Sequence, residues 1–277
     1  MKFKKSLLKA SLTFFAWAVI ILILWLPIAV IISGSFKPLV EFSRYPPTIF
    51  PARPTVQNYV ALANVTYLKN YVLNTIILML GTTVGTLVSS SIVAYPLAKM
   101  NFRGKNVWFG TILATMMVPS CVTIIPQYIL FSKLGWLNTF WPIIVPAWFA
   151  YPYNVFLFRQ FYRTIPAALD EAARIDGASE WQIFVKIIVP LARPVFITIG
   201  LLSSIFWWNE FFIPLVFLQA EKLKPLSVGI FSFARTWFLM RWDLVMAIAS
   251  LMIVLPLFLF VSGRRYITEG IKTTGLK

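Results

Sequence analysis

Six long stretches of almost uninterrupted apolar residues run along this 277-residue chain. An α-helix needs roughly 20 such residues to cross about 30 Å of hydrocarbon. The pattern predicts membrane-spanning helices over residues 12–34, 70–98, 107–131, 138–158, 194–218 and 243–263. The strict alternation that builds a membrane β-barrel is missing. The sequence therefore predicts an all-α membrane protein with about six transmembrane helices, folded as one domain over residues 1–277.

The first apolar stretch follows four lysines within the first nine residues, as in a signal peptide. The small-residue pattern Ala16-Trp17-Ala18 imitates a cleavage site. Apolar residues continue to Ile32, however, whereas the apolar region of a signal peptide ends at the cleavage site. We interpret the stretch as an uncleaved membrane anchor.

Composition and charge support a membrane protein and suggest its orientation. Charged residues make up 12% of the chain, against about 25% in soluble domains. With a cytoplasmic N-terminus, sixteen of the 25 Lys and Arg residues face the cytoplasm, so the positive-inside rule predicts that both termini are cytoplasmic. The net charge of +16 is then mainly a topology signal, with action on an anionic substrate as the alternative. No basic surface interleaved with aromatic residues suggests a nucleic-acid partner.

Several kinds of chemistry are excluded by the residues present. The chain has no histidine, so it cannot build a Ser-His-Asp triad or a histidine metal site. Cys121 is the single cysteine, which rules out an internal disulfide or a thiolate cluster. No G-x-x-x-x-G-K-[ST] phosphate loop occurs. We therefore expect no catalytic residue, no metal ligand and no cofactor in this chain.

One polar segment, residues 166–190, separates the fourth and fifth predicted spans and holds four of the nine acidic residues. Pro166 and Gly177 are typical of the two ends of a helix, within which Asp170 and Arg174 form an i,i+4 pair. Ser179 to Gln182 fits a capping box that begins a second helix. An apolar stripe then precedes Pro190, formed by Ile183, Phe184, Ile187 and Ile188. The segment is predicted to be a cytoplasmic helix-turn-helix; a surface loop without a partner is the alternative.

The same segment carries a longer pattern. Glu171-Ala172-Ala173, Gly177, Ile187 and Val189-Pro190 match EAA-x3-G-x9-I-x-LP, with valine in place of leucine. This resembles the EAA loop of bacterial ABC importer permeases. From Asn74 onward the chain is similar to permeases of the maltose and sn-glycerol-3-phosphate type. The segments that carry this similarity are "AYPLAKMNFRGKN", "FRQFYRTIPAALDEAARIDGAS", "WWNEFFIPL" and "GIKTTGLK".

The resemblance implies the type I ABC importer permease fold in a bacterial inner membrane. It implies that two copies of a cytoplasmic ATPase, which bind ATP and Mg, move this chain and a second homologous permease subunit. An extracytoplasmic solute-binding protein would deliver a carbohydrate, an oligosaccharide or a sugar derivative. Within the loop, we expect Glu171, Ala172, Ala173 and Gly177 to dock on the ATPase. Ile187 is expected to pack beneath the bundle, and Pro190 closes the loop.

Residues of the substrate path are harder to assign. Glu210 lies within the fifth predicted span, where a carboxylate is costly unless it faces a cavity or a partner. Its neighbour Asn209 is a second candidate, and weaker polar candidates are Gln127, Tyr153 and Asn154. A hydrogen bond that holds the bundle together is the alternative for Glu210. The proline-rich residues 45–59 are predicted to form an irregular extracytoplasmic loop, either a contact for the solute-binding protein or a plain connector.

Two other classes of function remain to be weighed. A secondary transporter or channel subunit that needs no ATPase predicts inverted repeats and unwound spans, and the sequence shows no such symmetry. A membrane enzyme needs a catalytic cluster, for which the lack of histidine and the few carboxylates leave little material.

Overall fold

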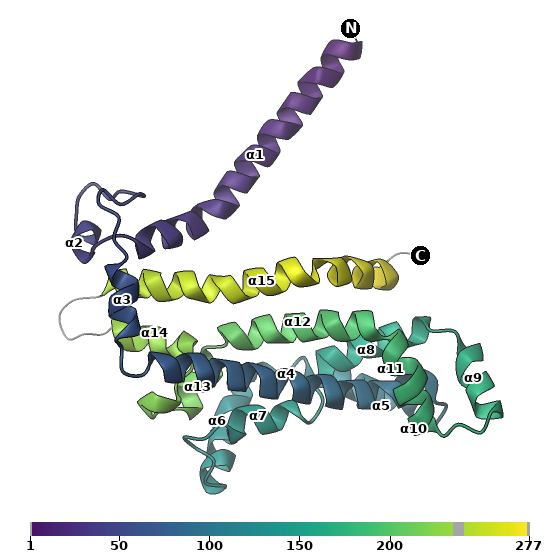
Figure 1. The fold of residues 1–277 in the computed structure, drawn as a ribbon. Helices are drawn as coiled ribbons and strands as arrows, with labels where there is room; N and C mark the ends of the chain where they lie inside the picture. The colour runs from purple at the N-terminus through teal and green to yellow at the C-terminus, as the bar shows by residue number, and fades with distance from the viewer. Residues whose placement is uncertain (1, 235–240, 276–277) are drawn as a thin grey trace. The chain divides into compact units, whose positions relative to one another are not determined.

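The computed structural model describes residues 2–234 and 241–275, and helices are the only regular secondary structure in these ranges. The chain (Figure 1) divides into two compact units. Unit 1 comprises residues 1–68 and 230–255, and unit 2 comprises residues 69–229 and 256–277. Each unit is described by itself below.

Three of the predicted spans are continuous helices. They are α1 (Lys2–Ser35), α4 (Leu68–Lys99) and α15 (Trp242–Gly275). Within the described ranges, these are the helices whose length and composition suffice for crossing a membrane singly. The segment Glu180–Leu191 followed by Arg193–Asn209, bent by 74°, adds a fourth if it counts as one span.

The other three predicted spans are helical but interrupted. They contain α5 (Lys105–Thr115) and α6 (Ser120–Lys133), α7 (Trp141–Ala147) and α8 (Pro152–Thr164), and α12 (Arg193–Asn209) and α13 (Phe212–Phe217). Hydropathy averages composition over a window, so it detects an apolar stretch without showing whether its helix is continuous.

The break between α7 and α8 is held by α4. The backbone N–H of Ala150, a residue with φ of 63°, donates to Ser89 Oγ at 3.0 Å, and the N–H of Tyr151 donates to Ser90 Oγ at 2.9 Å. Trp148 lies against Gly85, whose missing side chain leaves room for the indole. Irregular backbone is tolerated at membrane depth only when its polar groups find protein partners, and α4 supplies them here.

Unit 1 joins the end of α1 to α2 (Leu39–Phe42), α3 (Gln57–Ala63) and the first part of α15. Buried Asn58 donates its amide to the carbonyls of Ser35 and Lys37, both at 2.8 Å. Tyr59 Oη lies 2.7 Å from Ser35 Oγ and 2.9 Å from Ser250 Oγ. The predicted irregular loop, residues 45–59, is irregular up to residue 56, and its last three residues belong to α3, which begins at Gln57.

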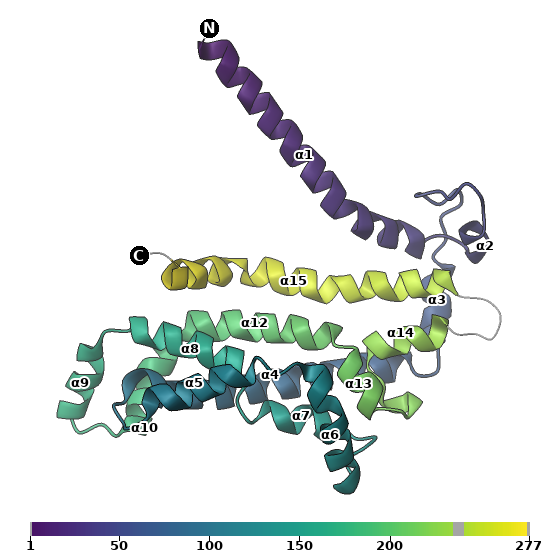
Figure 2. The same ribbon diagram turned by 180° about the vertical axis from the view of Figure 1, so that it is seen from behind.

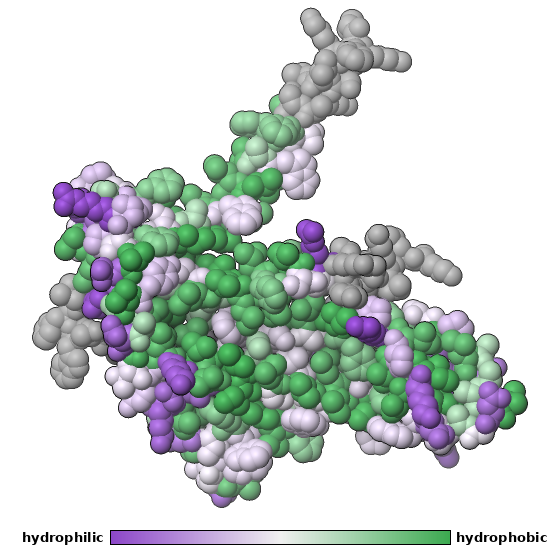
Figure 3. Space-filling model, viewed as in Figure 1, coloured by the Kyte–Doolittle hydropathy of each residue, from purple (hydrophilic) through white to green (hydrophobic). Residues whose placement is uncertain are grey.

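One core cluster of unit 2, called the unit 2 core below, is formed by α4, α8, α12 and the segment 166–190. Its fully buried side chains include Val155, Phe158, Tyr162, Ile183, Ile188 and Ile199. Two views place α9 (Ala167–Ile175) and α10 (Glu180–Ile183) at the same end of this unit (Figures 1 and 2). Hydrophobic residues cover much of the visible surface, and hydrophilic residues lie both near that end and near α13 (Figure 3). A surface of this kind suits a protein whose middle faces lipid.

Shorter helices complete the chain. A π-helical turn (Phe184–Ile188) and α11 (Val189–Leu191) follow α10. A 3₁₀ turn (Glu221–Leu223) precedes α14 (Leu226–Ala234). The π turn ends two residues before Pro190, a residue that has no backbone N–H to continue the regular helical ladder.

Candidate functional site

Residues 166–190 form a helical hairpin, as the sequence predicts. The first helix, α9, follows Pro166, and Gly177 occupies the left-handed region at φ 79°. The second helix begins with the complete capping box, in which Ser179 N donates to Gln182 Oε1 at 2.8 Å and Gln182 N donates to Ser179 Oγ at 3.3 Å. These local bonds fix the turn between the two helices, so the hairpin presents a defined surface.

The residues of the hairpin that match the EAA pattern divide between its surface and its core. The side chains of Glu171 and Ala172 are exposed. No atom lies within 4 Å of the position that a Cβ at Gly177 would take. Ala173, expected to dock, is instead buried in the unit 2 core at 8% exposure, and Ile187 packs against the same core, as expected for it. Of the four residues expected to dock, Glu171, Ala172 and Gly177 are therefore the exposed ones, and Pro190 at the end of the pattern is exposed as well.

The predicted ion pair between Asp170 and Arg174 is wrong. Asp170 Oδ2 lies 2.9 Å from Lys99 Nζ at the end of α4, and both side chains are buried. Arg174 Nε lies 2.7 Å from Glu180 Oε1 across the turn. Asp170 shares the buried face of α9 with Ala173 and points into the unit, whereas Arg174 stays near the surface. The hydrogen bond that Arg174 donates to Glu180 is the main cause that raises the pKa of Arg174.

Glu210 caps the break between α12 and α13. Its Oε1 accepts a hydrogen bond from the backbone N–H of Ile213 at 3.0 Å. Its backbone carbonyl accepts one from Ser227 Oγ at 2.6 Å. The exposed amide of Asn209 donates to the carbonyl of Ile205 in its own helix, at 2.8 Å. The Glu210 carboxylate thus supports the local fold at the break. This bond is local, so it differs from the bundle-holding hydrogen bond considered as the alternative for Glu210.

The weaker candidates for the substrate path lie on other helices, Gln127 on α6 and Tyr153 and Asn154 on α8. Gln127 Nε2 is 3.5 Å from Thr123 Oγ1 in α6. Tyr153 is exposed, and Asn154 is buried with its Nδ2 3.5 Å from Ser203 Oγ. In the part of the chain that the structure describes, no hydrogen bond joins any two of the five candidates. The structure therefore does not assemble them into one polar cluster.

Replacing Glu210 separates its capping role from its charge. Gln keeps an oxygen that can accept from the Ile213 N–H, whereas Ala leaves that N–H unpaired. We expect Glu210→Ala to destabilise the protein by about 1–2 kcal/mol and Glu210→Gln to change stability little. Thermal unfolding of the detergent-solubilised protein measures both effects. Equal destabilisation by the two variants would contradict the capping role, since it would mean that the charge itself stabilises the break.

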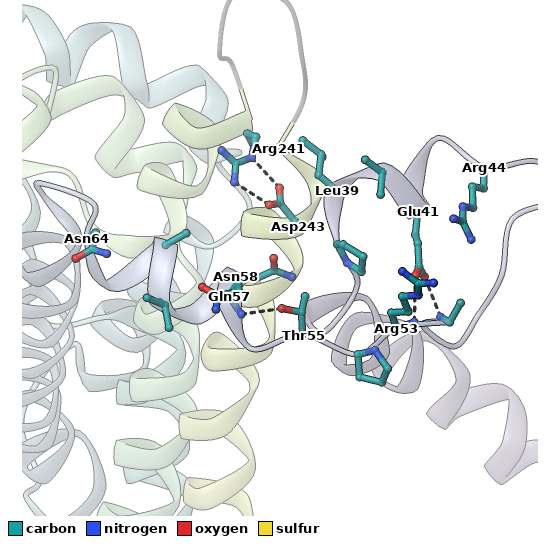
Figure 4. Close-up of a pocket in the computed structure, with 16 residues that line it drawn as sticks. Leu39, Glu41, Arg44, Arg53, Thr55, Gln57, Asn58, Asn64, Arg241 and Asp243 are labelled. Atoms are coloured by element: carbon teal, nitrogen blue, oxygen red, sulfur yellow. Dashed lines mark hydrogen bonds and ion pairs between the residues drawn. The ribbon is translucent and has the colours of Figure 1, made fainter.

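An open pocket of about 1100 Å³ lies in unit 1 and contains none of the predicted site residues. Buried Glu41 accepts from the backbone N–H groups of Ala52 and Arg53, at 3.0 and 3.2 Å (Figure 4). Arg241 and Asp243 form an ion pair at 2.8 Å on another part of its lining. Residues 52–55 of the proline-rich loop line this pocket, and the two hydrogen bonds to Glu41 hold this part of the loop in place.

Comparison with known proteins identifies the family. Residues 86–272 match the family described as binding-protein-dependent transport system inner membrane component. The arabinooligosaccharides transport system permease protein of Halalkalibacterium halodurans is 32% identical, with all of both chains covered. The melibiose/raffinose/stachyose import permease protein of Bacillus subtilis is 31% identical, with 91% of each chain covered.

A solved structure supports the same assignment. The fold is similar to that of a bacterial ABC transporter involved in the import of the acidic polysaccharide alginate, with a TM-score of 0.83 and 25% sequence identity. The match covers 94% of this chain and 96% of that one. Family, relatives and fold thus agree: this chain belongs to the binding-protein-dependent inner membrane components and is a multi-pass permease subunit of an ABC importer.

Proposed function

We propose that this permease subunit imports a carbohydrate and is driven by a separate ATPase that docks on the α9–α10 hairpin. The observation that carries the proposal is the exposed surface of Glu171, Ala172 and Gly177 on a hairpin whose turn is fixed by local hydrogen bonds. An exposed carboxylate can bind a basic residue of the ATPase. Gly177 permits close approach, because nothing fills the space beside it.

The proposed assembly contains two copies of the cytoplasmic ATPase, which bind ATP and Mg, and a second homologous permease subunit. A solute-binding protein delivers the substrate on the extracytoplasmic face. Carbohydrate is the proposed substrate class because relatives named for arabinooligosaccharides and for melibiose, raffinose and stachyose resemble the chain over nearly its whole length. Large apolar side chains of α1 between residues 12 and 26 are exposed, which suits contact with lipid or with the second permease.

The proposed orientation places both termini in the cytoplasm. The excess of Lys and Arg on that side supports it. The hairpin then faces the cytoplasm, where an ATPase can reach it. For the substrate path we retain Asn209, Glu210, Tyr153, Asn154 and Gln127 as proposals, of which Asn209 and Tyr153 have exposed side chains in the isolated chain.

The purified chain alone is expected to hydrolyse no ATP, because its sequence contains no phosphate loop. Hydrolysis should appear when an ABC ATPase is co-expressed and co-purified with it. The rate of ATP hydrolysis of both preparations is measured as phosphate release. An ATPase variant with its phosphate-loop lysine replaced is the control for contamination. Sustained hydrolysis by the chain free of any other ATPase would overturn the proposal.

A further inference from the structure

The C-terminal turn of α4 is bound to both helices of the hairpin. Lys99 Nζ lies 2.9 Å from Asp170 Oδ2 on α9, and the two side chains are only 6% and 3% exposed. One turn earlier on α4, Tyr95 Oη donates to Glu180 Oε2 on α10 at 2.7 Å. One end of a long membrane helix therefore contacts each half of the hairpin through a carboxylate.

The Lys99–Asp170 pair has no substitute nearby. Asp170 Oδ1 is buried and has no hydrogen-bond partner among the described residues. Two other cations at this end of α4, Lys105 and Arg159, donate instead to backbone carbonyls of residues 97, 98 and 100. Lys99 also donates to the carbonyl of Ile165, at 2.7 Å, just before α9. Separating Lys99 from Asp170 would leave a buried carboxylate without compensation, which is strongly unfavourable.

The second contact joins the two helices of the hairpin to each other as well as to α4. Glu180 accepts from Tyr95 with one oxygen and from Arg174 of α9 with the other. The ring of Tyr95 also packs on that of Phe184, with centroids 5.1 Å apart. Since each carboxylate oxygen of Glu180 has its own partner, α9, α10 and the end of α4 are linked in one continuous network.

Helix α4 carries this network toward the membrane. It is a single helix of 32 residues, about 48 Å long. Farther along it, Ser89 and Ser90 hold the break between α7 and α8. If the hairpin moves and takes the end of α4 with it, the movement reaches the same helix that binds the α7–α8 break.

We infer that Lys99 and Tyr95 are positioning residues that transmit hairpin movement to α4 through Asp170 and Glu180. The inference rests on the proposed function of the hairpin as the ATPase-docking element. A packed apolar contact can slide with little loss of energy, but a buried ion pair loses its attraction when it separates. The network thus makes α4 the membrane helix that follows the hairpin when the docked ATPases move.

The main test variant replaces the ion pair by a neutral pair of similar size, Lys99→Met with Asp170→Asn, so that no buried charge is left alone. A second variant, Tyr95→Phe, removes only the hydrogen bond to Glu180 and keeps the ring contact with Phe184. Lys99→Arg is the conservative variant, because arginine can still pair with Asp170. Lys133→Met removes one positive charge from an exposed residue of α6 as the matched control.

The measurements are a pull-down of the ATPase, ATP hydrolysis and substrate uptake, all on the assembled transporter in the same vesicles. We expect the neutral pair to keep ATPase association and hydrolysis but to lower uptake per ATP about tenfold, within the range of coupling between distant sites. Tyr95→Phe should have a smaller effect in the same direction, and Lys99→Arg and Lys133→Met should resemble the wild type.

Each outcome bears on the inference. Unchanged uptake per ATP in the neutral-pair variant would overturn the inference. A loss of ATPase association in that variant would also overturn it, because the ion pair would then only maintain the fold of the hairpin. An unmodified chain that fails to bind any ATPase would instead overturn the proposed function. The two failures are therefore distinguishable in one experiment.

Discussion

Gly177→Trp is expected to abolish ATPase binding and uptake while the chain still inserts into the membrane at normal levels. The space beside Gly177 is open in this chain, so the indole meets no internal clash. The positive φ of 79° costs a non-glycine residue only about 1–2 kcal/mol. A large loss of ATPase binding must then arise because the indole sterically blocks the ATPase from contacting the hairpin. Pull-down of the ATPase and substrate uptake in vesicles measure it, with membrane levels checked by blot.

A matched control for this variant is Gly135→Trp. Gly135 has φ of 69° and, like Gly177, no atom within 4 Å of the position that a Cβ would take, so the backbone strain is comparable. We expect that variant to bind the ATPase and to keep uptake close to the wild-type rate. Gly177→Asn is a second control, since asparagine tolerates the left-handed region and is small. Wild-type association of Gly177→Trp would show that the hairpin turn does not face the ATPase.

Glu171→Lys is expected to weaken ATPase association about a hundredfold, because a like charge placed against a basic residue costs several kcal/mol at an interface. The exposed side chain of Glu171 lies outside the unit 2 core, so the reversal should leave the fold intact. Glu171→Gln should have an intermediate effect, since the amide can still accept a hydrogen bond. Titration of the ATPase onto detergent-solubilised permease gives the affinities.

Salt provides an internal check on the Glu171 prediction. Added salt screens exposed charges, so wild-type association should weaken between low and physiological ionic strength. ATPase association of the Glu171→Gln variant should depend less on salt, because this variant lacks the carboxylate whose attraction to a basic residue of the ATPase is screened. Identical affinities and salt dependences for all three proteins would mean that Glu171 is not in the docking surface.

The hairpin was predictable because its signals are local. A proline before α9, a glycine after it and a capping box at Ser179 lie within a few residues of the structures that they form. The partner of Asp170 was not predictable in the same way. Helical spacing favours Arg174, but the buried lysine that binds Asp170 comes from a distant helix, and Tyr95 and Glu180 are 85 residues apart. Only the tertiary fold brings these groups together.

The interrupted spans illustrate a related limit. The α12–α13 break contains Glu210 and Phe211 within an otherwise apolar stretch, so hydropathy averaged over a window leaves it hidden, and Glu210 then resembles a charge in mid-membrane. In the structure its carboxylate pairs with the backbone N–H of Ile213 at the start of α13. A carboxylate just before the start of a helix is a local signal that could have suggested this contact, because negative charge is favourable near a helix N-terminus. Similarly, Ala173 belongs to the docking pattern by type, but its place on the inner face of α9 depends on tertiary packing.

The contact of α4 with the α7–α8 break has a consequence for the biogenesis of the protein. The hydroxyl acceptors Ser89 and Ser90 precede their amide donors by 61 residues in the chain. Synthesis proceeds from the N-terminus at about 5–20 residues per second, so α4 leaves the ribosome several seconds before the break does. The acceptors are thus already made when the donors emerge. The reverse order would expose two unpaired amides to lipid until their partners were translated.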